Sequence, residues 1–278
     1  MDTATMREKI QAAVRDARAT GPLAGSITNT VTINLVANAQ LAVGGSAAMV
    51  YFADEAEGLA EMGGAFYVNV GTFLPSYASS IPAVGDRMHQ LGKPLVLDPV
   101  GIGLGSLRSW TLTKLKEDKP AIVRGNASEI IALARLWGLD AGAAGEQGPR
   151  GVDSVDEVDD AVAAARAIAE FTGGAVAISG EADTVVSAQY KAVSHGGSAM
   201  MKSITGMGCS QGGVIVVYAA VSDPFTAALT GVQIYNFAGA QAAQRAKGTG
   251  SMQVEFLDAL STATPEDVAA NPFEIEEW

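Results

Sequence analysis

Residues 94–129 read PLVLDPVGIGLGSLRSWTLTKLKEDKPAIVRGNASE, and their pattern indicates the class of fold. It begins with a short apolar run at 94–97 and ends near another at 121–123, with a segment of helical spacing at 106–116 between them. Apolar runs this short are typical of strands that are buried on both faces. A strand, a helix and a second strand in this order predict two parallel strands joined by a crossover helix.

The same alternation extends in both directions along the chain. Further apolar runs occur at 65–70 and 175–178, and further segments of helical spacing occur at 34–43, 54–62, 127–137 and 155–171. The last third has helical spacing throughout, at 209–221, 224–247 and 251–260. Since no repeat or break in composition divides the chain, we expect one α/β domain over residues 1–278, with a mainly parallel central sheet and helices on both faces. The glycine-rich segment 138–151 has no period, which predicts a surface loop.

Composition and charge exclude several classes of function. The 278 residues are 48% hydrophobic and 17% charged, which excludes a disordered chain. One cysteine excludes a disulfide framework, and two histidines exclude most zinc chemistry. The formal net charge of −12 argues against a nucleic-acid partner and against an anionic membrane surface. Because the chain has neither an apolar run of roughly 20 residues nor a signal-peptide pattern, we expect a cytoplasmic protein.

Polar side chains and glycines follow the predicted strands. In an open parallel sheet, ligands bind beyond the carboxyl ends of the strands. Asp98, Arg124 and Ser179 each come directly after an apolar run. A fourth strand end is expected at 203–204, ahead of the small-residue segment TGMGC at 205–209. We therefore expect these four points of the chain to meet at one edge of the sheet.

The segment 205–209 leads into a predicted helix. Amide N–H groups at a helix N-terminus attract anions, and the small residues Gly206 and Gly208 leave those groups accessible. The segment therefore predicts an anion hole that holds the terminal phosphate of a nucleotide as charge shifts during transfer. The sequence contains no P-loop motif, and neither this segment nor GIG at 101–103 has the third glycine of the dinucleotide fingerprint.

Each of these residues also has an ordinary structural interpretation. Asp98 is compatible with a turn that ends a strand, and Arg124 with a side chain that reaches solvent. Asn126 and Glu129 have the spacing of a helix capping box, which still leaves Glu129 free to act toward a metal or a phosphate. Cys209 is compatible with a small buried apolar residue, and because a free thiol is mostly protonated at neutral pH it would be a weak general base.

These motifs, taken together and in their order, resemble the hydroxyethylthiazole kinase family of the ribokinase-like superfamily. The segments that carry the resemblance are TNTVTINLVAN at 28–38, NVGT at 69–72, LDPVGIG at 97–103, RGNASEI at 124–130, GVDS at 151–154 and TGMGC at 205–209. They extend over most of the chain. The resemblance implies a ribokinase-like fold and ATP-dependent phosphorylation of the primary hydroxyl of 4-methyl-5-(2-hydroxyethyl)thiazole, a step of thiamine salvage that uses Mg²⁺.

The resemblance also implies roles for individual residues. Arg124 and Ser179 match positions that contact ATP, and Cys209 matches the residue near the accepting hydroxyl. Asp98 and Glu129 match acidic positions associated with magnesium and phosphate. The full set of candidates is Arg124, Ser179 and Asn126 for ATP, Met49 and Gly206 for the thiazole, Asp98 and Glu129 for Mg²⁺, and Cys209, Gly206 and Gly208 for catalysis.

The family forms homotrimers with sites between subunits, so Asn29 and Met49 are expected to face the nucleotide-side residues of a neighbouring subunit. The chain has Ser46-Ala47-Ala48-Met49 where the family commonly has Ser-Pro-x-Met, and Ser179 where a threonine is usual. Two alternatives therefore stay open. One is a ribokinase-like kinase of a related small alcohol such as hydroxymethylpyrimidine, and the other is a non-catalytic sensor of a nucleotide or a thiazole. Loss of Asp98, Glu129 or the glycine segment would favour the sensor, and all three are present.

Overall fold

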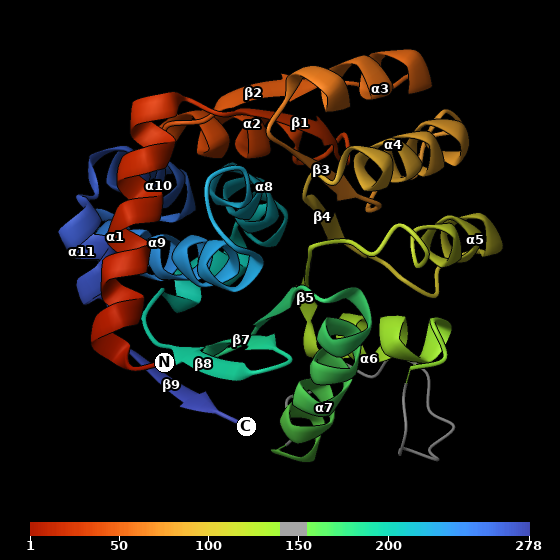
Figure 1. Ribbon diagram of the computed structural model, residues 1–278. Coiled ribbons are helices and arrows are strands. Elements are labelled where there is room, and N and C mark those ends of the chain that lie inside the picture. Colours follow the sequence, from red (N-terminus) through yellow and green to blue (C-terminus); the bar gives the residue numbers. More distant parts are fainter. Residues whose placement is uncertain (140–154) are drawn as a thin grey trace.

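In the computed structural model of this chain, which describes residues 1–139 and 155–278, nine strands form one sheet (Figure 1). Their order across the sheet is β2-β1-β3-β4-β5-β6-β7-β8-β9. Neighbouring strands from β2 to β6 are parallel, and the pairs β6–β7, β7–β8 and β8–β9 are antiparallel. The bounds are β1 Leu23–Ile27, β2 Ser46–Met49, β3 Ala65–Asn69, β4 Leu95–Asp98, β5 Ile122–Asn126, β6 Ala175–Ser179, β7 Asp183–Ser187, β8 Tyr190–Ser194 and β9 Phe273–Glu277.

Helices cover both faces of the sheet, which confirms the predicted α/β class (Figure 1). One layer contains α1 Thr3–Thr20, α2 Ile33–Ala42, α8 Met207–Ala219, α9 Pro224–Arg245, α10 Thr249–Thr262 and α11 Pro265–Ala270. The other layer contains α3 Ala53–Met62, α4 Tyr77–Leu91, α5 Ser106–Lys114, α6 Ala127–Leu136 and α7 Val155–Thr172.

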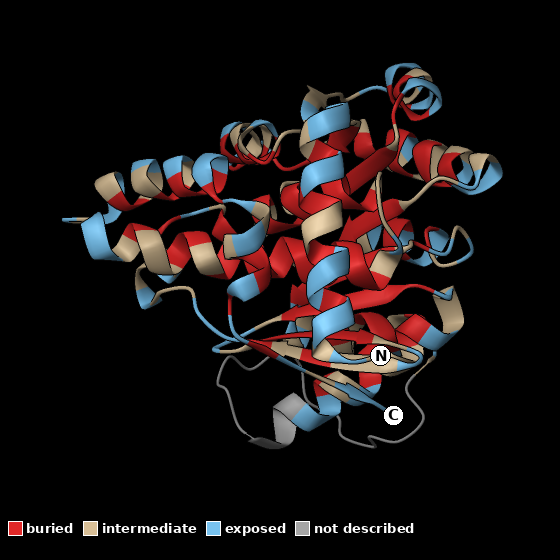
Figure 2. Cartoon of the chain, turned by 60° about the vertical axis from the view of Figure 1, so that its left-hand side comes forward, coloured by how far each residue is buried: buried red, intermediate tan, exposed pale blue. Residues whose placement is uncertain are grey.

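Strand side chains alternate between two hydrophobic cores. On β3, Ala65 and Tyr67 belong to the core under α8, whereas Phe66 and Val68 belong to the core under α4. Successive side chains of a strand point to opposite faces, so a strand between two helix layers is apolar at every position. This explains the uninterrupted apolar runs of the sequence. Figure 2 shows the central strands buried, while the outer helices carry exposed residues on their solvent side.

The strand end expected at 203–204 is wrong. Ala199–Ser203 form a 3-10 turn, η1, which Ser198 caps: its hydroxyl accepts a hydrogen bond from the Met200 amide. A local bond between a side chain and the backbone competes with pairing in a sheet. Ile204 reaches the core directly after this turn and is buried without forming a strand.

Two predictions fall at the boundary of the described residues. The loop predicted at 138–151 lies outside them from residue 140 onward, and so does the motif at 151–154. Helix α7 begins directly after this gap and confirms the helix predicted at 155–171. Among the helices that the structure describes, none is long and apolar enough to cross a membrane.

Candidate active site

Polar side chains at the carboxyl ends of the central strands meet on the face that α8 covers. Tyr67 and Asn69 lie two residues apart on β3 and therefore share a face, and Asn69 is in register with Asp98 at the end of β4. On the next two strands, Arg124 is in register with the residue two positions before Ser179. The predicted convergence of Asp98, Arg124 and Ser179 is thus present in the fold.

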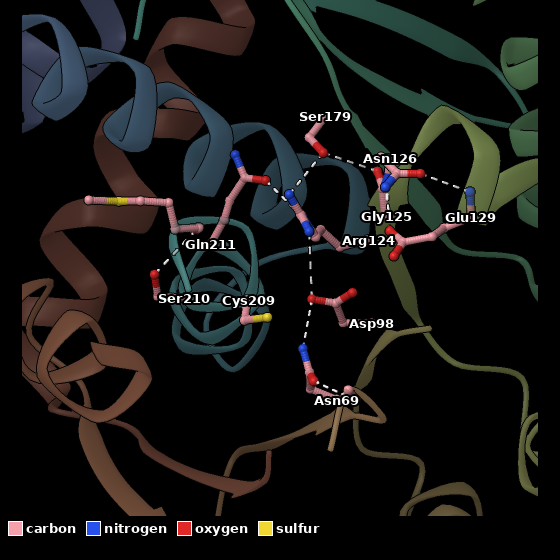
Figure 3. Close-up of polar contacts among 12 residues, drawn as sticks. Asn69, Asp98, Arg124, Gly125, Asn126, Glu129, Ser179, Cys209, Ser210 and Gln211 are labelled. Carbon is pink, nitrogen blue, oxygen red and sulfur yellow. Dashed lines mark hydrogen bonds and ion pairs between the residues drawn. The ribbon is translucent and has the colours of Figure 1, made fainter. Parts of the chain in front are cut away.

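Arg124 is the centre of the polar contacts in this region (Figure 3). Its side chain is 8% exposed, its Nη2 donates to Ser179 Oγ at 2.9 Å, and its Nε donates to Gln211 Oε1 at 3.0 Å. Its Nη1 lies 3.6 Å from Asp98 Oδ2. Burial by itself lowers the pKa of Arg124, but the negative charges of Asp98 and Glu129 raise it, so the guanidinium stays charged. The interpretation of Arg124 as a solvent-directed side chain is therefore wrong.

Asp98 is fully buried and has one oxygen without a partner. Its Oδ2 accepts hydrogen bonds from the Tyr67 hydroxyl and from Asn69 Nδ2, each at 3.0 Å. Its Oδ1 has no hydrogen-bond partner among the described residues. Burial raises the pKa of Asp98 to about 7, against the opposing effect of Arg124. A buried carboxylate oxygen without a donor fits a site for a cation or for the water around it.

The segment 205–209 forms the start of α8, as predicted. Gly206 is the N-cap with a φ of 92°, in the left-handed region that favours glycine, and a Cβ there would lie 2.9 Å from Thr32 Cγ2. A Cβ on Gly208 would lie 2.9 Å from Arg124 Nη1. The helix backbone therefore lies directly against the guanidinium. The first N–H groups of a helix have no partner within it, so this end of α8 and Arg124 together suit a phosphate.

We expect Gly208→Ala to weaken ATP binding by about tenfold, because the methyl group displaces the guanidinium of Arg124 from its hydrogen bonds. Calorimetric titration with ATP measures the effect. Gly250→Ala on α10 is the control, since nothing lies within 4 Å of its added Cβ, and its affinity should equal that of the wild type. Equal affinities for Gly208→Ala and the wild type would contradict the close contact.

Cys209 lies between the strand ends and α8. Its thiol accepts a hydrogen bond from Asn29 Nδ2 at 3.3 Å. Its carbonyl oxygen lies 2.7 Å from the Tyr67 hydroxyl, whose one proton it shares with Asp98 Oδ2. Burial raises the pKa of the Cys209 thiol, and the charge of Asp98 raises it further. A thiol that keeps its proton is a weak base.

A pocket of about 870 Å³ opens beside Arg124. This volume lies within the range of small-molecule and cofactor sites. Of the candidate residues, Arg124, Ser179, Gly206 and Gly208 are in its lining. The other lining residues include Asp183, Lys202, Gln211 and Asn236.

Asn126 and Glu129 form the capping box that their spacing predicts. The side-chain oxygen of Asn126 accepts the Glu129 amide at 2.9 Å, and Glu129 Oε2 accepts the Asn126 amide at 2.9 Å. The pair caps α6 and lies beside the pocket rather than in its lining. The charge of Glu129 still raises the pKa of Asp98. In the described part of the chain no group of three or more His, Cys, Asp or Glu residues could hold a metal ion, so these two carboxylates would need further ligands such as water and phosphate.

Met49 lies at the other end of the candidate site. It ends β2, which is separated from β5 by β1, β3 and β4 in the sheet, so at the usual spacing of neighbouring strands it is about 19 Å from β5. Met49 is in register with Ser26 and packs against the core under α8. The structure therefore does not bring Met49 together with Arg124. The contact between Asn29 and Cys209 lies between these two ends.

Sequence reasoning missed several residues of this site. Gln211 contacts Arg124, and its position three residues after Gly208 on the same helix could have indicated it. Tyr67 lies two residues before Asn69 on one strand, and the strand period could have placed it on the same face. Nothing in the sequence pattern points to Lys202 or Asn236, which reach the pocket from η1 and α9.

Comparison with known proteins connects this geometry to a family. The model of the hydroxyethylthiazole kinase family matches residues 14–266. The chain belongs to the hydroxyethylthiazole kinase family. A hydroxyethylthiazole kinase of Bifidobacterium longum is 48% identical over 281 residues, covering 95% of this chain and 90% of that protein. A second hydroxyethylthiazole kinase, of Cereibacter sphaeroides, is 39% identical over 251 residues, covering 90% of this chain and 92% of that protein.

Solved structures agree with this membership of the hydroxyethylthiazole kinase family. The structure of a hydroxyethylthiazole kinase from Pyrococcus horikoshii OT3 has a TM-score of 0.85 and 26% identity, and covers 98% of this chain and 99% of that chain. A ribokinase-like superfamily protein from Enterococcus faecalis V583 shares the fold, with a TM-score of 0.64 and 14% identity. The match covers 96% of this chain and 95% of that chain. These findings confirm the predicted family and the ribokinase-like fold, and they make the protein a kinase.

Proposed function

We propose that this protein transfers the terminal phosphate of ATP to the primary hydroxyl of 4-methyl-5-(2-hydroxyethyl)thiazole, as a step of thiamine salvage. The observation that carries the reaction type is the buried cation Arg124 at the N-terminus of α8, in a pocket of about 870 Å³. Membership of the family supports the substrate. The alcohol is proposed to lie between Met49 and Cys209, and the nucleotide between Cys209 and Lys202.

Phosphoryl transfer requires positioning and charge neutralisation more than covalent chemistry. In this proposal Arg124 neutralises phosphate charge, Ser179 holds its guanidinium through the bond at 2.9 Å, and the amides of Gly206 and Gly208 receive the phosphate that is transferred. Cys209 lies beside the accepting hydroxyl. A largely dissociative transition state needs little base strength, so a protonated thiol is compatible with turnover.

We infer that Asp98 and Glu129 hold Mg²⁺, largely through water. The buried Oδ1 of Asp98, which has no partner among the described residues, supports this assignment. Mg²⁺ usually keeps several waters and is bound by one or two carboxylates together with phosphates, which suits two carboxylates beside a phosphate pocket. When bound, the ion would neutralise phosphate charge. Asn126 orients Glu129 through the capping box and so would act on the Mg²⁺ site indirectly.

Cys209 variants separate positioning from base strength. We expect Cys209→Ala to lower kcat by about tenfold or less, because the thiol contributes contact and orientation but little proton transfer. Cys209→Asp should retain or increase kcat, since a carboxylate is a stronger acceptor for the hydroxyl proton. Steady-state rates, with melting curves to show that each variant is folded, measure both effects. A folded Cys209→Asp protein without activity would contradict this placement of the hydroxyl.

We further infer a homotrimer in which neighbouring subunits share sites. Two large apolar side chains support an interface near the Met49 end of the site: Val31 is 67% exposed and Phe52 is 59% exposed. They follow Asn29 and Met49 closely in the sequence. Sedimentation equilibrium should give the mass of three chains for the wild type, and Phe52→Glu should lower it. A monomer at all concentrations would contradict the inference.

The proposed reaction is tested by ADP release with Mg-ATP and the hydroxyethylthiazole, beside hydroxymethylpyrimidine and a control without acceptor. We expect release that depends on the thiazole. ADP release only with the pyrimidine would support a kinase activity but contradict the thiazole as its substrate. No release with any acceptor, from folded protein that binds ATP, would contradict the kinase reaction.

A further inference from the structure

Gln211 is a buried residue on α8, three positions after Gly208, with 4% of its surface exposed. Its Oε1 accepts the hydrogen bond from Arg124 Nε at 3.0 Å, and it lines the pocket. Figure 3 shows its side chain extending from the helix toward the guanidinium. A single helix therefore places both its N-terminal backbone and a side-chain amide against Arg124.

Gln211 accepts a hydrogen bond from Nε of Arg124, whereas the other partners among the described residues contact Nη1 and Nη2. The guanidinium is planar and donates from three nitrogens. Ser179 accepts from Nη2 at 2.9 Å, and Asp98 lies 3.6 Å from Nη1. These contacts come from β6 and β4, whereas the contact at Nε comes from α8. Three partners on three elements fix the rotation of the guanidinium plane as well as its position.

Asp183 determines which end of the Gln211 amide faces Arg124. Asp183 is 8% exposed, its Oδ2 accepts from Gln211 Nε2 at 3.3 Å, and its Oδ1 accepts from the Gly180 amide at 3.0 Å. A flipped amide would set its NH₂ group against the Arg124 N–H and its oxygen against the carboxylate. The carboxylate therefore selects the orientation in which the amide oxygen points to Nε.

The amide contacts Arg124 without adding a second carboxylate to the guanidinium. Asp98 approaches the guanidinium directly, whereas Asp183 is linked to it by hydrogen bonds through the neutral side chain of Gln211. Burial raises the pKa of Asp183, and the charge of Arg124 opposes that rise. A carboxylate in place of this amide would compete with a phosphate for the same cation. The neutral link orients the guanidinium and leaves its positive charge available to an anionic ligand.

We propose that Gln211, oriented by Asp183, is a positioning residue that holds the guanidinium plane of Arg124 for the phosphate groups of the nucleotide. The inference rests on the proposed function, since it takes the ligand of Arg124 to be ATP. It predicts that Gln211 contributes to the affinity for the nucleotide and has little effect on the binding of the alcohol.

The test is calorimetric titration of the full chain with ATP in the absence of any alcohol. Gln211→Leu removes the hydrogen bonds of the amide to Arg124 and to Asp183 while keeping a side chain of similar size. We expect the Kd for ATP to rise by about tenfold. Gln211→Glu keeps an acceptor for Nε but adds a negative charge, so its Kd should rise at least as much. Gln211→Met replaces Gln211→Leu if the leucine variant does not fold.

Gln40 provides the matched control. It is also a buried glutamine in the same helix layer, and its Nε2 donates to Ser26 Oγ at 2.9 Å, away from Arg124. Gln40→Leu should lower the melting temperature and leave the Kd for ATP unchanged. Wild-type affinity in Gln211→Leu, or an equal loss of affinity in both variants, would overturn the proposal.

A steady-state measurement adds a second readout. With Gln211→Leu, KM for ATP should rise while KM for the thiazole stays within about twofold of the wild type, which a merely structural defect would not produce. A wild-type protein that binds ATP but phosphorylates no thiazole would contradict the proposed function and leave the titration valid as a test of Gln211. A wild-type protein that does not bind ATP would overturn both.

Discussion

Arg124→Met is expected to lower kcat/KM by about a thousandfold or more, because it removes the buried cation that neutralises phosphate charge. The fold should survive. Asp98 loses its ion-pair partner at 3.6 Å, but burial already raises the pKa of this carboxyl to about 7, so it can take up a proton instead of remaining as an unpaired charge. The coupled ADP-release assay measures the rate, and ATP titration measures the loss of affinity.

Arg87 supplies the control for this variant. It pairs with Glu61 at 2.6 Å on the surface of α4, away from the pocket, and Arg87→Met should leave kcat/KM unchanged. An Arg124→Met protein with near wild-type rates would show that the phosphate site lies elsewhere.

Asp98→Asn is expected to lower kcat/KM by about a hundredfold or more, because an amide has no negative charge to pair with Arg124 or with a divalent cation. The variant mimics the protonated carboxyl. The pKa of Asp98 is raised to about 7, so lowering the pH through this value protonates its carboxylate. The wild-type rate should therefore fall as the pH decreases below about 7. The residual rate of Asp98→Asn should not change over this range.

Rate profiles of the two proteins between about pH 6 and pH 8 test the assignment. An acid limb that persists unchanged in Asp98→Asn would mean that another group titrates. A variant with the wild-type rate would contradict any role of this carboxylate in the reaction.

The central part of the fold was predictable because its strands are buried on both faces. Continuous apolar runs such as 65–70 and 175–178 have no other simple explanation, and the segments between them have helical spacing. The edge of the sheet gave no such signal. Ser46–Met49 is partly exposed, and Phe273–Glu277 carries three glutamates, so neither segment is continuously apolar. Helix α4 was also missed, since Pro82 and two serines hide its period.

The candidate site was predictable where topology alone brings residues together. Asp98, Arg124 and Ser179 follow parallel strands, and the carboxyl ends of parallel strands meet at one edge. Gln211 lies three residues after Gly208 on the same helix, but this spacing identifies it as a site residue only once the packing of α8 against Arg124 is known. The distance of Met49 from this cluster follows from the strand order, which the sequence does not reveal.

The proposed reaction transfers a phosphoryl group to the hydroxyl of the hydroxyethylthiazole. Phosphorus NMR of the product formed with Mg-ATP tests it most directly, because a phosphate ester on the side chain couples to the neighbouring CH₂ protons. We predict one new monoester resonance that shows this coupling, with ADP in equal amount, and no such resonance with Arg124→Met. ADP accompanied only by inorganic phosphate, or an ester on another alcohol alone, would contradict the proposed reaction.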